Sequence, residues 1–371
     1  MGRVAIVTGG AGLLGSWLIH TLASHNYRKV FVLARGKGDI TAKNRVFDAL
    51  KFCRNGRGSF WKDEAIQIVR GDVCKAHLDL PSVTRTELLK QVTDVFHTAA
   101  LTDLNASIDL LRQPNVTGTE NVFKLALEAN RITKHPIRVH HISSVTVAGD
   151  SQGWFSENQL TRNQHFHNAY EETKFEAELL AIEYRKRGLN IEIYRPGIIT
   201  GDSLRGVTSN FKTIYQPLRF LAHNLFKIWP GREDAILSLV PVDKVAEAIW
   251  LLSEAEKPPN GVWHLVNTEE TSLDKLIEIG TAVFECRRPT LVPAEHFDSG
   301  QFSPSQWRMM RPFVPYLNYR LRFSATHTNA VLNDAGFRWP KVDENMLEKL
   351  YRYCAKAGFI RARYLGQQPP R

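Results

Sequence analysis

Short apolar runs alternate with stretches of helical periodicity along the first half of the chain. The runs are rich in valine and isoleucine, a pattern typical of parallel strands that are buried on both faces of a sheet. We expect such strands at residues 4–7, 30–33, 66–69, 94–97, 139–142 and 191–194. The helical patterns between them cover residues 13–23, 41–52, 116–130 and 169–187. This alternation predicts an α/β fold with a doubly wound parallel sheet.

The pattern changes after residue 195. Helical stretches at 211–226 and 272–284 mix with turns marked by proline, while the apolar run 263–266 is typical of a strand that returns to the sheet. We therefore predict a first domain over residues 1–205 with a returning segment at about 236–268. A smaller, mostly helical domain would take about 206–235 and 269–371. Beyond residue 291 the aromatic- and arginine-rich sequence supports no assignment of elements.

Composition narrows the classes of protein. Of the 371 residues, 43% are hydrophobic and 23% are charged, which is ordinary for a globular chain. The longest apolar runs are shorter than the roughly 18 residues of a membrane span, and we expect no secretory leader. The four cysteines lie far apart, without the spacing of a zinc or redox site, which predicts reduced thiols in a cytoplasmic protein.

The net charge of +10 raises the question of nucleic-acid binding. No run of five or more basic residues and no recognition motif is present, so we expect no nucleic-acid partner. A phosphorylated cofactor or an acidic carrier explains the excess equally well. The histidines, including His167, show no helical i, i+4 pairing with a carboxylate, and we expect no metal site.

A glycine-rich turn follows the first expected strand. Segment 8–15 reads TGGAGLLG and leads directly into the first expected helix. Glycines allow a tight turn and the close approach of a pyrophosphate, whose charge the helix N-terminus favours. A strand, this turn and a helix in succession predict a dinucleotide site of the Rossmann type. The residues expected to form it are Thr8, Gly9, Gly12, Leu13, Leu14 and Gly15.

The end of the second strand bears on the choice of cofactor. Arg35 stands where an acidic residue would bind the ribose 2′-hydroxyl of NAD, whereas a basic residue suits the 2′-phosphate of NADP. Arg45 adds a second positive charge, and we expect NADP(H) as the cofactor. The alternative is that Arg35 is a solvated surface arginine without a role in cofactor binding. Asp72 is placed to accept a hydrogen bond from the adenine. Further cofactor contacts are expected at the ends of the third and fourth strands, from Val73, Thr98, Ala99 and Ala100.

Tyr170 and Lys174 lie four residues apart on the expected helix 169–187 and so share one helix face. A phenol has an ordinary pKa of about 10, and we expect the Lys174 ammonium to lower the pKa of Tyr170 toward working pH. At the end of the fifth strand, Ser144 rather than Ser143 would orient a carbonyl oxygen. This constellation predicts hydride transfer at a carbonyl, with Tyr170 exchanging the proton.

These residues together resemble the extended short-chain dehydrogenase/reductase family over about residues 3–270. The resemblance implies catalytic roles for Ser144, Tyr170 and Lys174. Within the family the chain is most similar to the thioester reductases and fatty acyl reductases, on the segments 42–46, 195–201 and 240–243. The resemblance also implies a structural or relay role for Asn115. It implies cofactor contacts from Asn115, Ser143, Lys174, Pro196, Gly197 and Ile199.

The resemblance implies that NADPH reduces an acyl thioester, carried by coenzyme A or by a carrier protein, to an aldehyde and in some members on to the alcohol. Apolar residues at helical spacing over 211–229 would line an acyl channel or simply pack in the core. Nearby basic residues would meet an acidic carrier or a coenzyme phosphate, or form a solvated face: Lys212, Arg219, Lys227 and Arg232.

The same scaffold also serves other functions. NADP-dependent alcohol or ketone dehydrogenases use the same three catalytic residues. Sugar-nucleotide epimerases and dehydratases share the family, but the epimerases usually retain NAD, which Arg35 argues against. A non-catalytic NADP-binding regulator is a third alternative, although such proteins usually lose the Tyr170 or Lys174 equivalent that this chain keeps. The oligomeric state stays open.

Overall fold

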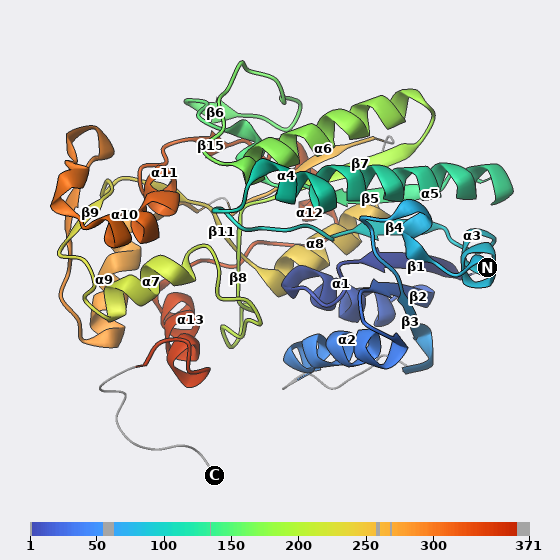
Figure 1. Ribbon diagram of the computed structural model, residues 1–371, viewed down its shortest axis with the longest axis horizontal. Coiled ribbons are helices and arrows are strands. Elements are labelled where there is room, and N and C mark those ends of the chain that lie inside the picture. Colours follow the sequence, from blue (N-terminus) through green and yellow to red (C-terminus); the bar gives the residue numbers. More distant parts are fainter. Residues whose placement is uncertain (1, 55–62, 134, 257–259, 268, 362–371) are drawn as a thin grey trace, which may run out of the picture.

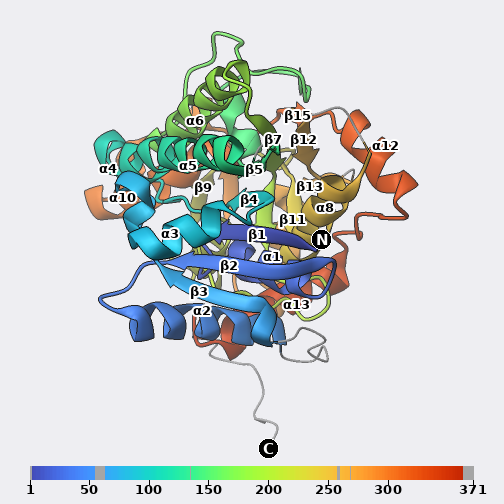
Figure 2. The ribbon, with the colours of Figure 1, turned by 90° about the vertical axis from the view of Figure 1, so that its right-hand side faces the viewer.

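A seven-stranded parallel sheet forms the centre of the protein in the computed structural model, which describes residues 2–54, 63–133, 135–256, 260–267 and 269–361. The strand order is β12-β7-β5-β4-β1-β2-β3, and every neighbouring pair is parallel. The prediction of a doubly wound parallel sheet is confirmed (Figures 1 and 2). The strands are β1 (Arg3–Thr8), β2 (Tyr27–Ala34), β3 (Ile66–Arg70), β4 (Asp94–His97), β5 (Arg138–Ile142), β7 (Asn190–Pro196) and β12 (Val262–Leu265).

Helices cover both faces of this sheet because the side chains of each strand point alternately to the two sides. In β1, Ala5 and Val7 pack in one core layer, whereas Val4 and Ile6 pack in the other. The first layer contains α1 (Leu13–Ala23), α2 (Asp39–Arg54) and α8 (Val242–Glu254). The second contains α3 (Ser82–Leu89), α5 (Gly118–Thr133) and α6 (Ala169–Lys186), and α4 (Ile108–Arg112) contacts α6.

The chain leaves the sheet after β7 and returns to it once. β8 (Ile198–Thr200) pairs with β11 (Leu239–Pro241), which leads into α8. Strand β12 then lies next to β7 at the sheet edge, so the expected returning strand at 263–266 joins the main sheet, as the apolar run predicts. Three small pairs complete the strands: β9 (Ile228–Pro230) with β14 (Thr290–Val292), β10 (Ile236–Leu237) with β13 (Thr271–Ser272), and β6 (Trp154–Phe155) with β15 (Arg322–Phe323).

A second apolar core lies beyond the carboxyl ends of the strands, in the mostly helical C-terminal part (Figure 1). Its helices are α7 (Tyr215–Ala222), α9 (Leu273–Phe284), α10 (Pro304–Met310), α11 (Val314–Leu317) and α13 (Glu344–Lys356). In contrast, α12 (Thr326–Asp334) packs back on the sheet layer through Leu332. None of the described helices is both long and apolar enough to cross a membrane.

The expected helix at 211–226 is wrong in its bounds. Helix α7 covers only Tyr215–Ala222, and β9 begins at Ile228. Proline lacks a backbone N–H and fits only the first turn of a helix, so Pro217 requires the helix to begin close before it. Asn224 then adopts a left-handed backbone conformation at φ +51°, which ends the helix. Residues 210–214 are therefore an irregular loop, and this loop reaches the site described below.

Candidate active site

A cavity of about 310 Å³ lies at the carboxyl ends of the parallel strands, which is where α/β sheets bind their ligands. One side is formed by the glycine turn, the ends of β5 and β7, and the start of α6. The other side comes from residues 210–217, 236–238 and 313–323 of the later chain. Of the residues expected from the sequence, the cavity brings together Gly9, Gly12, Leu13, Leu14, Gly15, Thr98, Ala100, Ser143, Ser144, Tyr170, Lys174, Pro196, Gly197 and Ile199.

The glycine turn fits the phosphates of a dinucleotide. Gly9 has φ +71°, and a Cβ atom there would lie 2.7 Å from the Ala99 nitrogen. A Cβ atom on Gly15 would lie 2.3 Å from the carbonyl oxygen of Gly9, so the turn and the helix can pack this closely only without side chains. Gly12 precedes α1 without a side-chain cap, and the first turn of α1 holds no acidic residue. The unpaired N–H groups and positive end of α1 therefore face the cavity, as an anion requires.

Thr8 and Ala99 stand behind this turn rather than in the cavity wall. The Thr8 hydroxyl lies 2.7 Å from Nδ1 of His97 and accepts a hydrogen bond from the Ala99 N–H at 3.3 Å. His97 is buried, and Nε2 of its ring lies 3.0 Å from the Thr119 hydroxyl. Burial, with a smaller contribution from the charge of Lys174, lowers the pKa of His97 to about 3. A neutral imidazole thus joins β1, β4 and α5 beneath the site.

The residues expected at the adenosine end lie outside the cavity: Arg35, Asp72 and Val73 follow the adjacent strands β2 and β3, and Arg45 lies on α2. Arg35 and Arg45 are exposed, and Arg45 Nη1 donates a hydrogen bond to the Arg35 carbonyl at 2.9 Å. Asp72 accepts from the Cys74 N–H at 3.0 Å, and the Val73 carbonyl accepts from the side-chain amide of Asn121 at 2.8 Å. The Arg35 guanidinium forms no ion pair within the described part of the chain.

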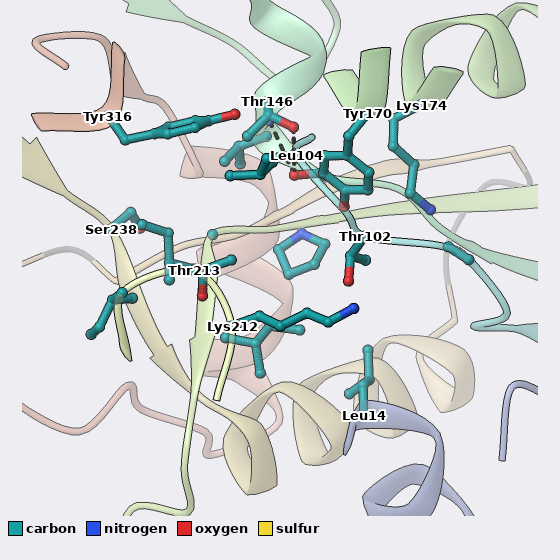
Figure 3. A pocket seen from close by; sticks show the side chains of 18 of the residues that line it. Leu14, Thr102, Leu104, Thr146, Tyr170, Lys174, Lys212, Thr213, Ser238 and Tyr316 are labelled. Atoms are coloured by element: carbon teal, nitrogen blue, oxygen red, sulfur yellow. Dashed lines mark hydrogen bonds between the residues drawn. The ribbon is translucent and has the colours of Figure 1, made fainter. Parts of the chain in front are cut away.

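Helix α6 places Tyr170 and Lys174 on the cavity wall. Asn168 caps the helix, since its side-chain oxygen accepts from the N–H groups of Tyr170 at 3.1 Å and Glu171 at 3.2 Å. Tyr170 therefore lies in the first turn, and Lys174 lies one turn later on the same face (Figure 3). The Lys174 Nζ donates a hydrogen bond to the Ile142 carbonyl at 2.8 Å, which fixes it at the end of β5. Burial lowers the pKa of Lys174 to about 8.

The expectation that Lys174 lowers the pKa of Tyr170 is wrong. Burial raises the pKa of Tyr170 to about 12, an interaction with the Ser144 side chain lowers it, and the charge of Glu171 raises it. The Lys174 ammonium points to the Ile142 carbonyl instead and does not contribute. At neutral pH Tyr170 is consequently a neutral phenol, which is a proton donor.

The two adjacent serines have different surroundings. Ser144 Oγ accepts from the N–H of Thr146 at 3.2 Å and from the Thr146 hydroxyl at 2.9 Å, and its side chain interacts with Tyr170. Ser143 Oγ donates to the buried carboxylate of Glu178 at 2.5 Å. Glu178 in turn pairs with the buried guanidinium of Arg195 at 2.7 Å. The Ser143 hydroxyl is therefore bound to the carboxylate of the buried Glu178–Arg195 ion pair, whereas the Ser144 hydroxyl lies next to the Tyr170 phenol.

Asn115 ties two parts of the structure together. It lies in a short π-helical turn (Gln113–Thr117) before α5. Its side-chain oxygen accepts from the Leu101 N–H at 2.8 Å, and its amide nitrogen donates to the Leu101 carbonyl at 3.1 Å and to the Thr173 hydroxyl at 3.0 Å. The loop after β4 is thus held against the helix that carries Tyr170.

One histidine, His167, pairs with a carboxylate just before α6. Nδ1 of His167 lies 3.0 Å from the Glu171 carboxylate, at the i, i+4 spacing that was not expected. His167 precedes the cap of α6, so the pair spans the helix start rather than one helical turn. The other Glu171 oxygen accepts from the Tyr316 hydroxyl at 2.6 Å, and that hydroxyl accepts from Asn168 at 2.8 Å. No group of three or more possible metal ligands occurs in the described ranges.

Several cavity residues were not expected from the sequence. They come from loops and very short elements without a motif, so no local signal marks most of them. On the side that faces the glycine turn and Tyr170, the later chain contributes Lys212, Thr213, Ile214, Ser238, Phe313, Tyr316, Leu317, Tyr319 and Phe323. Of these, Lys212 was named in the sequence analysis, and Ile214 belongs to the apolar positions expected over 211–229, on a helix start that the structure replaces by a loop.

A comparison with family models identifies the relatives of this chain. The model of an NAD-binding family described as male sterility protein matches residues 7–249. The chain belongs to this family. The resemblance to the extended short-chain dehydrogenases/reductases and their thioester reductase branch is thereby confirmed, and the protein is an NAD(P)-binding oxidoreductase.

Two curated relatives are larger proteins. A subunit of linear gramicidin synthase from Brevibacillus parabrevis is 27% identical over 378 residues, which cover 97% of this chain and 7% of that protein. Carboxylic acid reductase of Segniliparus rugosus is 29% identical over 282 residues, which cover 68% of this chain and 23% of that protein. The chain thus spans less than a quarter of the length of either relative.

Solved structures share the fold across the whole chain. The terminal R domain of the myxalamid PKS-NRPS pathway superposes with a TM-score of 0.83 at 24% identity, covering 98% of this chain and 93% of that one. A thiolation-reductase di-domain of an archaeal non-ribosomal peptide synthetase superposes with a TM-score of 0.73 at 21% identity, covering 97% of this chain and 91% of that one. UDP-glucuronic acid 4-epimerase of Bacillus cereus, in complex with NAD, superposes with a TM-score of 0.67 at 17% identity, covering 95% of this chain and 99% of that one.

Proposed function

We propose that the protein uses NADPH to reduce an acyl thioester to an aldehyde and a free thiol. The observation that supports this most is the single cavity in which the glycine turn, Ser144, Tyr170 and Lys174 meet an apolar wall from the later chain. A dinucleotide held at the turn would supply a hydride to the carbonyl carbon. One thioester, one hydride and one proton give one aldehyde and one thiol.

Tyr170 and Ser144 would act on the carbonyl oxygen. As negative charge develops there, the Ser144 hydroxyl would donate a hydrogen bond and the neutral Tyr170 phenol would transfer its proton. A pKa of about 12 keeps the phenol protonated at neutral pH, which favours the reductive direction, because oxidation would need a phenolate. The resulting hemithioacetal breaks its C–S bond, and the thiol leaves.

Lys174 and the end of β7 would position the reacting end of the cofactor. With a pKa of about 8, Lys174 is mostly charged at neutral pH, although it is buried. Its Nζ uses one hydrogen bond on the Ile142 carbonyl and keeps two N–H groups for ribose hydroxyls. Pro196, Gly197 and Ile199 line the same cavity and would contact the nicotinamide.

We assign NADP rather than NAD from the adenosine end. Arg35 is exposed at the end of β2, next to the end of β3, and Arg45 holds its backbone carbonyl. Two guanidinium groups without an acidic residue at the strand end suit a 2′-phosphate. Asp72 would accept from the adenine amino group, beside Val73.

The later chain would recognise the acyl group and its carrier. We propose that residues 1–205 and 236–268 hold the cofactor, and that 206–235 and 269–371 bind the substrate. Lys212 lines the cavity on the loop 210–214 and would meet the phosphate of coenzyme A or of a carrier-bound phosphopantetheine. The neighbouring thiolation domain in the archaeal structure supports delivery by a carrier protein.

The deciding experiment follows NADPH consumption with acyl-CoA and acyl-pantetheine thioesters while the free thiol is titrated. One NADPH per thiol is expected for an aldehyde product, and two per thiol if the aldehyde is reduced further to the alcohol. NADPH consumption with ketones or aldehydes alone would overturn the proposal and indicate an alcohol dehydrogenase. Tyr170→Phe serves as the control for background oxidation.

A further inference from the structure

Two residues that line the cavity carry hydroxyl oxygens that are buried and have no hydrogen-bond partner within the described part of the chain. These oxygens are Oγ of Ser238 and the phenolic oxygen of Tyr319. Two other hydroxyls of the same wall have partners: Tyr316 donates to Glu171, and Thr146 donates to Ser144. A buried hydroxyl that lacks a partner destabilises a folded protein, so such groups in a ligand cavity point to a polar partner on the ligand.

The two orphan hydroxyls come from segments that run side by side. Ser238 lies between β10 and β11, and Tyr319 lies between α11 and β15. The Ile236 N–H donates to the Tyr319 carbonyl at 2.8 Å, which joins the two segments. The Ser238 hydroxyl also approaches the end of β7, because a Cβ atom on Gly197 would lie 2.8 Å from it. In Figure 3, Ser238 and Tyr316 lie across the cavity from Tyr170 and Lys174.

The surroundings of these hydroxyls are apolar. The Tyr319 ring stacks on Phe323 with 6.2 Å between centroids. Phe313, Leu317 and Leu237 line the same side of the cavity. Burial, with the charge of Glu171, raises the pKa of Tyr319 well above its ordinary value, so the group remains a neutral hydroxyl. A few polar groups in an apolar wall are the usual means by which a pocket selects its ligand.

We propose that Ser238 and Tyr319 form a polar subsite for a carbonyl or amide group within the acyl chain. This inference rests on the proposed function for the nature of the substrate, an acyl thioester. The enzyme would then favour chains with an internal amide or oxo group over plain alkyl chains of equal length. An alkyl chain leaves both hydroxyls unpaired, and sites built around hydrogen-bonding groups reject analogues that lack the matching group.

The test uses pantetheine thioesters of equal chain length. Heptanoyl-pantetheine is compared with a set in which one amide replaces two chain atoms at successive positions, such as N-butanoylglycyl-pantetheine. The wild type is expected to prefer at least one amide member by about tenfold in kcat/KM, or about 1.4 kcal/mol. Ser238→Ala and Tyr319→Phe should each reduce that preference several-fold, because kcat/KM for the amide member falls more than kcat/KM for the heptanoyl thioester.

Tyr351→Phe is the matched control. Tyr351 is buried in the helical core, and its hydroxyl donates to the Leu276 carbonyl at 3.2 Å, away from the cavity. Its loss should leave the preference unchanged. The proposal is overturned if the wild type prefers no amide member, or if the Ser238→Ala/Tyr319→Phe double variant loses amide and heptanoyl turnover equally.

Binding separates the subsite from the reaction. Analogues with the thioester sulfur replaced by N–H cannot be reduced, and their affinity is measured by calorimetry with NADPH present. If no thioester is turned over but the amide-bearing analogue still binds more tightly, and loses this advantage in the double variant, the subsite stands and the proposed function falls. If thiol is released equally fast from the heptanoyl and the amide-bearing thioesters, the proposed function stands and the subsite falls.

Discussion

Glu178 forms a buried ion pair with Arg195 next to Ser143 of the cavity. Its carboxylate accepts from Arg195 Nε at 2.9 Å and from Nη2 at 2.7 Å, and the two side chains are 1% and 2% exposed. Glu178→Gln keeps the shape of the side chain and removes its charge. The Arg195 guanidinium then remains buried without a counter-charge, which is the arrangement that makes the loss of one ion-pair partner costly.

The expected loss of folding free energy is about 3 kcal/mol. Breaking a buried pair by removing one partner costs roughly 3–5 kcal/mol. The lower end applies because glutamine still accepts one hydrogen bond and the Gln159 carbonyl still accepts from Arg195 Nη1 at 2.8 Å. Against a total stability of about 5–15 kcal/mol, this is a large fraction. The charge of Glu178 also raises the pKa of Lys174, so the variant should lower that pKa further below about 8.

Urea unfolding at neutral pH, followed by tryptophan fluorescence, measures the loss as a shift of midpoint at constant slope. Glu183→Gln on the same helix is the control, because its pair with Arg187 is about half exposed on both sides and such pairs contribute about 0–1 kcal/mol. A Glu178→Gln variant within 1 kcal/mol of this control would refute the reasoning. It would show that the cost of burying the two charges cancels their attraction.

Three further predictions concern catalysis. Tyr170→Phe should leave NADPH binding intact and lower turnover by about a hundredfold or more, because the proton donor is lost; unchanged turnover would exclude Tyr170 as the acid. Arg35→Ala should raise the KM for NADPH by about tenfold or more and change that for NADH little, with exposed Lys43→Ala as control; equal changes for both cofactors would remove Arg35 from 2′-phosphate recognition. The kcat/KM for NADPH should fall as pH rises through about 8, where Lys174 loses its charge, and a profile flat to pH 10 would contradict this.

Local sequence patterns were sufficient for the sheet and for the side of the cavity formed by the glycine turn and α6. The apolar run before Thr8, the glycines that follow it and the spacing of Tyr170 and Lys174 each act within one turn or one helix. Backbone geometry alone then brings them to the same edge of the sheet. The returning strand β12 could be predicted for the same reason, since a buried strand carries its own apolar signal.

Features that depend on contacts between distant segments could not be predicted in this way. The pKa of Tyr170 follows from how deeply the phenol is buried and from the hydrogen bond that turns Lys174 toward Ile142. The four-residue spacing of Tyr170 and Lys174 predicts neither the burial nor this hydrogen bond. Ser238 and Tyr319 line the same cavity only because two segments far apart in the sequence join through the hydrogen bond from the Ile236 N–H to the Tyr319 carbonyl. The error over 211–226 had a local cause, because apolar periodicity was weighed without the position of Pro217.

The side chain of Asn168 serves two parts of the molecule at once. Its oxygen caps the helix that carries Tyr170, while its nitrogen donates to the Tyr316 hydroxyl from the later chain. For protein engineering this means that the mostly helical C-terminal part cannot be exchanged on its own. A chimaera that imports this part from a relative without a tyrosine at this position would lose the hydrogen bond from Asn168 and loosen the start of α6. Such transplants should therefore carry the Asn168–Tyr316 pair across together.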